Sequence, residues 1–247
     1  MVFFAAMSIT RILTIYVAQG LVCVFFIFLA YKILKRDRKR LNVIFAGFYI
    51  SPVVGFIVNF IYGPLTDETL ALVLNFITNF GIFYTPIFLV VFDLILLKSE
   101  KVINTTKQLA ILILYGIALF SMIFFVFVED VGVEMALGAT GEAPDWSPHW
   151  FLPFFLYVVI IESVFAVGPS LYLSFQIYKK FEDEELRKKW KLFIIGFCCL
   201  MIFMYGIFIS NLLNNSTFRL VMGATGLILA IASGYLIYTG VGRQLEK

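Results

Sequence analysis

Two carboxylic acids lie inside long apolar stretches of this sequence, where ionisable groups are costly and indicate function by default. Glu162 is twelve residues after Trp150 and sixteen before Tyr178. At 1.5 Å per helical residue, these aromatic residues are about 18 Å and about 24 Å away, which places Glu162 near a membrane midplane. No Lys or Arg is predicted at that depth, so we expect a protonated carboxyl. It binds a ligand, couples to protons, or forms a hydrogen bond between helices.

The second acid, Asp93, is five residues before Lys98 at the end of the third apolar stretch. At that depth its side chain can reach the membrane surface or pair with basic residues there. The alternative is a role in coupling the membrane region to a cytoplasmic partner.

Amide side chains form a further group in the outer half of the apolar stretches, away from the end where Asp93 lies. They are Asn59, Asn75, Asn79 and Asn211. Asn75 and Asn79 are four residues apart and share one helix face. Such amides often form hydrogen bonds between membrane helices. In the alternative interpretation they line a ligand pocket that opens to the outside, with Tyr84 and Glu162 deeper in the bundle.

Several kinds of catalytic and metal chemistry lack their residues in this sequence. His149 is the only histidine, and the three cysteines (Cys23, Cys198 and Cys199) do not have the spacing of a metal site. A phosphate-binding glycine loop is also absent. We therefore expect a protein without catalytic residues, cofactor or metal.

The elements that position these residues are predicted to be helices in lipid. Hydrophobic residues make up 62% of the 247 and charged residues 14%, whereas soluble domains have roughly 25% charged residues. A helix needs about 20 apolar residues to cross a bilayer, and lipid requires backbone groups to bond internally. The sequence predicts an all-α, seven-helix transmembrane bundle in the cell membrane, with spans at 11–34, 41–62, 69–97, 108–128, 150–178, 190–213 and 219–241.

The basic residues predict how the bundle is oriented. All of the 19 Lys and Arg residues except Arg11 and Arg219 fall after spans 1, 3 and 5 or at the C-terminus. Cytoplasmic loops carry such an excess, so the N-terminus is expected outside and the C-terminus inside. The basic character then reflects the cytoplasmic face and anionic lipids, and nucleic acid is not expected as a partner.

The longest predicted connection, 129–149, is on the outer side and contains Trp146. With Trp150 it suits an aromatic belt at the membrane interface. We also expect this loop to act as a lid over the outer mouth of the bundle.

A phrase occurs twice in the sequence. "RKRLNVIFAGF" covers Arg38–Phe48, and "RKKWKLFIIGF" covers Arg187–Phe197. Each copy begins a span that leaves the cytoplasm. Either basic loops and apolar helices converged on the same pattern, or spans 1–3 and 5–7 are parallel repeats joined by span 4, as in some transporters.

The segment "FEDEELRKKWK" precedes span 6. Its acids stand four residues before Arg187, Lys188 and Lys189, which favours a helix that extends into the cytoplasm. These three cations are either a solvated helix start or a docking surface for a signalling protein.

The layout resembles the seven-helix sensor region of prokaryotic, especially archaeal, histidine kinases. The residues that carry the resemblance are "RKKWKLFIIGF" at the start of span 6 and the glycine-rich last span, which ends "YLIYTGVGRQLEK". Such regions normally feed a kinase domain. Since this chain stops at Lys247, the resemblance implies a signal passed to a separate protein.

The sequence thus predicts a receptor-like sensor that binds an unknown small molecule or lipid and signals to a cytoplasmic partner. Two alternatives stay open. One is a small-solute or proton-coupled transporter, and the other is a non-catalytic membrane scaffold subunit.

Overall fold

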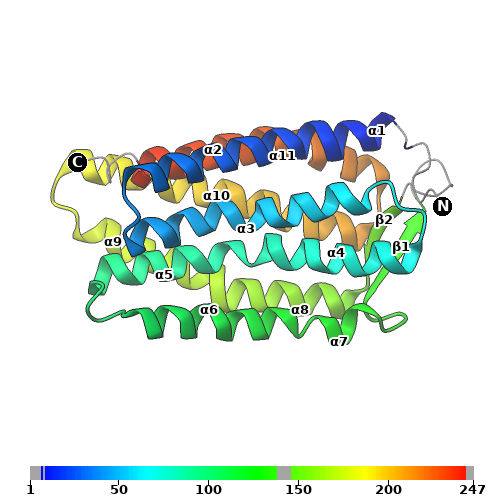
Figure 1. Cartoon of the computed structure of the whole chain (residues 1–247), viewed down its shortest axis with the longest axis horizontal. Helices are drawn as coiled ribbons and strands as arrows, with labels where there is room; N and C mark the ends of the chain where they lie inside the picture. The colour runs from blue at the N-terminus through cyan, green and yellow to red at the C-terminus, as the bar shows by residue number, and fades with distance from the viewer. Residues whose placement is uncertain (1–6, 8, 138–145, 243–247) are drawn as a thin grey trace.

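The computed structural model describes residues 7, 9–137 and 146–242 of the chain, and these form one helical bundle (Figure 1). The described residues contain seven helices long and apolar enough to cross a membrane. They are Leu13–Arg36, Arg40–Tyr62, Glu68–Lys98, Thr105–Val126, Leu152–Lys180, Glu184–Leu213 and Thr217–Val241. The prediction of seven long apolar helices is confirmed, and we number these helices as spans 1 to 7 in this order.

Most spans are interrupted. Span 1 comprises a π-helical segment η1 (Leu13–Gln19) and α2 (Gly20–Arg36), and the short α1 (Ile9–Ile12) precedes it. Span 3 divides at Tyr84 into α4 (Glu68–Phe83) and α5 (Thr85–Lys98). Pro86 lies in the first turn of α5, where its missing N–H costs least. Span 4 is α6 (Thr105–Phe120) followed by the short α7 (Ile123–Val126).

Span 5 contains a second π-helical segment. It comprises α8 (Leu152–Glu162), η2 (Ser163–Val167) and α9 (Gly168–Lys180). Spans 2 and 6 are the single helices α3 (Arg40–Tyr62) and α10 (Glu184–Leu213). Span 7 is α11 (Ser216–Ile237) with the π-helical end η3 (Tyr238–Gly242).

The helices run antiparallel along the length of the molecule, with the loops after α2, α5 and α9 at one end (Figure 1). We call this the basic end because the predicted cytoplasmic cations lie there. Glycines allow close packing inside the bundle. A Cβ atom on Gly81 would lie 2.9 Å from the backbone nitrogen of Gly55, so α3 and α4 touch through their main chains.

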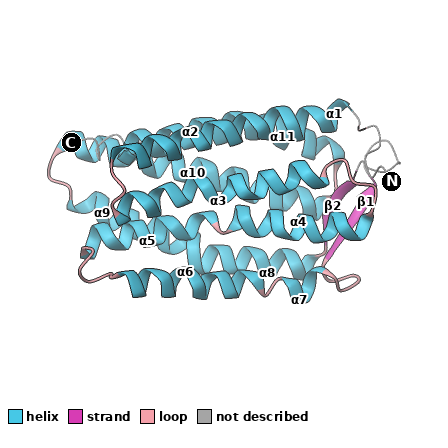
Figure 2. Ribbon diagram, in the orientation of Figure 1, coloured by secondary structure: helices cyan, strands magenta, loops and turns pink. Residues whose placement is uncertain are grey.

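The opposite end, which we call the hairpin end, carries the one departure from an all-helical fold among the described residues (Figure 2). Strands β1 (Val133–Leu137) and β2 (Trp146–Trp150) pair antiparallel, with Val133 opposite Trp150. The intervening part of the predicted lid, 138–145, lies outside the described residues. No alternating pattern in the sequence was strong enough to predict these strands.

The hairpin is fastened to the helices. The Trp146 indole N–H donates to the Leu65 carbonyl at 2.9 Å, and Arg219 donates to the Pro148 carbonyl at 3.0 Å. Arg11 donates to the carbonyls of Gly63 and Trp146. The prediction of a tryptophan belt at the interface is wrong, because Trp150 is fully buried among aromatic side chains and Trp146 is also buried.

Candidate functional site

Glu162 is the last residue of α8, and its side chain is fully buried. Neither carboxyl oxygen has a hydrogen-bond partner of standard geometry among the described residues. Immediately afterwards the helix widens into η2, where the Gly168 N–H donates to the Ser163 carbonyl, five residues back. A Cβ atom at position 168 would lie 2.6 Å from that carbonyl oxygen, so this turn requires glycine. Short π-helical segments of this kind occur frequently at functional sites.

Two tyrosines from neighbouring spans flank the buried carboxyl. Tyr115 of α6 interacts with Glu162, and its hydroxyl donates to the Phe83 carbonyl at 2.9 Å. Tyr205 of α10 is also within electrostatic range of Glu162, and its hydroxyl lies 2.7 Å from that of Ser163. The Glu162 cluster, defined as Glu162, Ser163, Tyr115 and Tyr205, therefore joins spans 4, 5 and 6, and Tyr115 also connects it to span 3.

The surroundings of Glu162 favour a neutral carboxyl. The Tyr115 hydroxyl uses its proton on the Phe83 carbonyl, so toward Glu162 it can only accept. No Lys, Arg or His among the described residues acts on this carboxyl. A protonated Glu162 can donate to the Tyr115 oxygen, whereas an ionised one has no partner for its charge.

The hydrogen bonds of the predicted amide residues do not involve this cluster. Asn79 donates to the Asn75 side-chain oxygen at 3.0 Å, and Asn75 donates to the Tyr62 hydroxyl at 2.9 Å. Asn59 donates to Gln19, which links spans 1 and 2. Asn211 is buried in span 6. These contacts are those of amides that hold helices together, and they do not place Asn59, Asn75, Asn79 and Asn211 around Glu162.

Tyr84 lies at the break in span 3, where its hydroxyl donates to the Leu112 carbonyl of α6 at 2.7 Å. Its ring packs on Gly116, where a Cβ atom would come 3.2 Å from the ring carbon Cε2. Tyr84 therefore sits beside Tyr115, at 5.8 Å between ring centroids. Sequence reasoning placed Tyr84 near this site and omitted Tyr115, because a tyrosine in an apolar run gives no signal of its partner.

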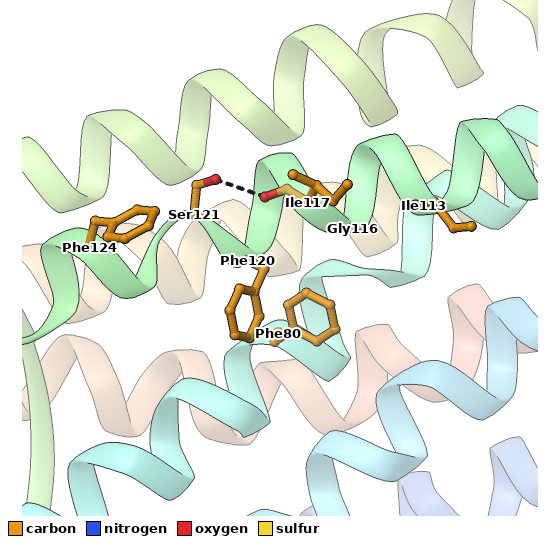
Figure 3. A pocket seen from close by; sticks show the side chains of 7 residues that line it. All are labelled: Phe80, Ile113, Gly116, Ile117, Phe120, Ser121 and Phe124. Atoms are coloured by element: carbon orange, nitrogen blue, oxygen red, sulfur yellow. Dashed lines mark hydrogen bonds between the residues drawn. The ribbon is translucent and has the colours of Figure 1, made fainter.

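A groove lies on the exposed surface of the bundle along α6, between spans 3 and 4 (Figure 3). Its volume is about 450 Å³, and the residues that line it are Phe80, Ile113, Gly116, Ile117, Phe120, Ser121 and Phe124. The only side-chain oxygen in this lining, on Ser121, donates to the Ile117 carbonyl at 2.8 Å. The groove is apolar and faces the lipid side, and Glu162 is not part of its wall. A second hollow, of about 520 Å³, lies near Asn215 and Phe218 at the hairpin end.

Asp93 is turned into the bundle. Its side chain is fully buried, and the Ser174 hydroxyl of α9 donates to its Oδ2 at 2.6 Å. The expectation that it reaches the surface or pairs with basic residues is wrong, because α5 presents this position to α9. The Trp190 indole N–H of α10 donates to the Ser174 carbonyl at 2.8 Å. Asp93 therefore connects spans 3, 5 and 6 near the basic end.

The predicted helical extension before span 6 is present, since α10 begins at Glu184. Asp183 caps it by accepting from the backbone N–H groups of Glu185 and Leu186, rather than by pairing with Arg187. The Arg187 guanidinium lies over the Tyr178 ring at 4.9 Å. Lys189 pairs with Glu185 at 2.5 Å as expected, and Lys188 is exposed.

Basic side chains also line the turn between spans 1 and 2, at the same end of the bundle. Lys39 Nζ lies 2.8 Å from Asp37, and its hydrogen bond lowers the pKa of that exposed carboxyl. Asp37 therefore stays ionised at neutral pH, and the turn keeps a fixed local pairing.

Comparison with protein-family models finds no match, and comparison with curated proteins finds none either.

Proposed function

We propose that this chain is a non-catalytic membrane sensor that binds a small apolar molecule or lipid from the bilayer. The observation that carries the proposal is the position of two consecutive residues of α6. Gly116 lines the lipid-facing groove, and Tyr115 contacts the buried Glu162 carboxyl. A ligand that moves α6 at the groove therefore moves the partner of the carboxyl as well.

The Glu162 cluster supplies a route from the groove to the basic end. Glu162 and Ser163 lie where α8 changes to η2, and Ser163 is bonded to Tyr205 of α10. A π-helical segment can return to regular helix with a shift of the residues beyond it. Such a shift would carry α9 and α10, whose far ends meet at Ser174 and Trp190.

The orientation belongs to this proposal. The basic end is the cytoplasmic end, and the hairpin end is outside, as the distribution of Lys and Arg favours. Arg187, Lys188 and Lys189 would then form the surface that a cytoplasmic signalling protein recognises. The resemblance to histidine-kinase sensor regions is consistent with this direction of signalling.

We also propose that the repeated phrase marks two parallel three-span units. Gly47 of the first copy faces the Phe88 ring of span 3, where a Cβ atom would come 2.5 Å from that ring. Gly196 of the second copy faces Ser233 and Leu236 of span 7, with a Cβ distance of 2.8 Å to Leu236. In both units, the repeated glycine thus allows the next span to pack closely: span 3 against Gly47 and span 7 against Gly196.

The test fills the groove and measures motion at the basic end. Nitroxide labels are placed on Lys101 and Glu184 in a background without Cys23, Cys198 and Cys199. Ile117→Trp occupies the groove, and we expect it to change the distance distribution between the labels in lipid nanodiscs. Ile228→Trp is the matched control, because Ile228 is similarly exposed (70%, against 61% for Ile117) and lies on span 7.

The relay through Tyr115 is tested in the same assay. Tyr115→Phe should abolish the change caused by Ile117→Trp, because it removes the hydroxyl beside Glu162. Tyr49→Phe is the control, since it removes another buried hydroxyl that donates to a backbone carbonyl, that of Gly234 at 3.0 Å. A change that persists in Tyr115→Phe, or equal changes from both tryptophan variants, would contradict the proposal.

A further inference from the structure

The surroundings of Asp93 differ from those of Glu162 in the kind of hydroxyl that faces the acid. Ser170 and Ser174 are four residues apart on α9, and both are fully buried toward α5. Ser174 donates to Asp93 Oδ2, and the Ser170 hydroxyl also interacts with this carboxyl. Asp93 Oδ1 and Ser170 Oγ are both left without a hydrogen bond of standard geometry among the described residues.

Serine hydroxyls rotate and can either donate or accept. If Asp93 is ionised, Ser170 can donate to Oδ1 while Ser174 donates to Oδ2. If Oδ1 carries a proton, it can donate that proton to Ser170 Oγ. The Ser170 hydroxyl can thus serve either protonation state, unlike the Tyr115 hydroxyl beside Glu162, whose proton is already committed.

No charged side chain among the described residues acts on the Asp93 carboxyl. Among the described residues, the side chains that act on it are Ser170 and Ser174 alone. On α3, Tyr49 donates to the Gly234 carbonyl and Arg40 to Thr105. On α6, Lys107 donates to the Val102 carbonyl, and on α10, Lys189 pairs with Glu185. A change of charge on Asp93 must therefore be balanced from water.

Asp93 lies close to the basic end of the bundle along the helix axis. Asp93 is five residues before Lys98, where α5 ends, which corresponds to about 7.5 Å. Glu162 is eighteen residues before Lys180, the end of α9, or about 27 Å from the basic end. Of the two buried acids, Asp93 is the one placed to exchange with solvent there.

We propose that Asp93, Ser170 and Ser174 form a proton-exchange site at the basic end of the bundle, with a single proton as its ligand. Binding forms one O–H bond on Oδ1 with a proton taken from water, and release reverses this step. Ser174 passes the change to span 6 through its carbonyl bond to Trp190. This inference concerns a separate site and does not depend on the groove.

The test uses the unaltered chain, grown with aspartate labelled with ¹³C at its side-chain carboxyl, in phosphatidylcholine nanodiscs. The other aspartates, at positions 37, 67, 130, 145 and 183, fall outside the spans. A labelled carboxylic-acid C=O band at neutral pH therefore belongs to Asp93. We expect infrared difference spectra to show this band at neutral pH and its loss as pH rises, while the bundle stays folded.

Variants and ions sharpen the result. Asp93→Asn should remove the band, Ser170→Ala should shift its frequency, and Glu162→Gln should leave it unchanged. The fluorescence of Trp190, identified as the emission that is lost in Trp190→Phe, should change over the same pH range as the band. The inference would be overturned if the band does not respond to pH. It would also be overturned if replacing choline chloride by NaCl at fixed pH removes the band, which would assign the site to sodium.

Discussion

At residue 162 the decisive property is the ability to donate a hydrogen bond inside the bundle. Gln keeps the shape of Glu, and its amide N–H can donate to Tyr115 as a protonated carboxyl does. We expect Glu162→Gln to change the free energy of unfolding by less than about 1 kcal/mol. Glu162→Ala leaves a cavity beside Tyr115 and should cost roughly 2 kcal/mol or more.

Thermal unfolding in detergent, followed by a thiol-reactive dye that labels the buried Cys23, measures both variants. If Glu162→Gln is as destabilising as Glu162→Ala, the carboxyl is ionised in the folded protein, and the neutral assignment fails.

The two buried acids also show how far residue-level reasoning from sequence extends. The lack of a basic partner for Glu162 followed from the absence of Lys and Arg in the middle of every predicted span. The orientation of Asp93 did not, because it depends on which face of α5 meets the serines of α9. Helix rotation is a property of packing between spans, and an apolar sequence on all sides of a helix does not specify it.

At the scale of helices, α3 and α4 meet through their backbones at Gly55 and Gly81. We expect Gly81→Ala to destabilise the bundle by about 1–3 kcal/mol, because its Cβ atom would meet backbone atoms that cannot rotate away. Gly20→Ala is the matched control, since no atom lies within 4 Å of the Cβ position. Unfolding in mixed detergent micelles compares the two, and equal stabilities would mean that α3 and α4 separate without cost.

Helix existence and helix ends were predictable to different degrees. All seven spans follow from the length of the apolar runs, and their bounds are within a few residues except at the start of span 6. There the charged segment Glu184–Lys189 continues the helix beyond the apolar run. The π-helical segment after Glu162 was signalled only by Pro169, and the strands of the hairpin had no signal, because five-residue segments depend on the partner they pair with.

For the molecule as a whole, the orientation is open to a direct test. In a background without native cysteines, a cysteine at Lys101 should react with a membrane-impermeant maleimide only after the cells are permeabilised. A cysteine at Glu129, near the hairpin, should react in intact cells. The opposite pattern would invert the bundle and place the basic end outside.

The hairpin gives the whole molecule a mechanical asymmetry. Three side chains connect the hairpin end. Arg11 joins the beginning of the first helix to the hairpin, Trp146 joins the hairpin to the turn between spans 2 and 3, and Arg219 joins it to the start of the last helix. Helices that are held together at the hairpin end have more freedom to move apart at the basic end. The largest displacements are therefore expected far from the hairpin, at the basic end where Trp190 and Ser174 meet.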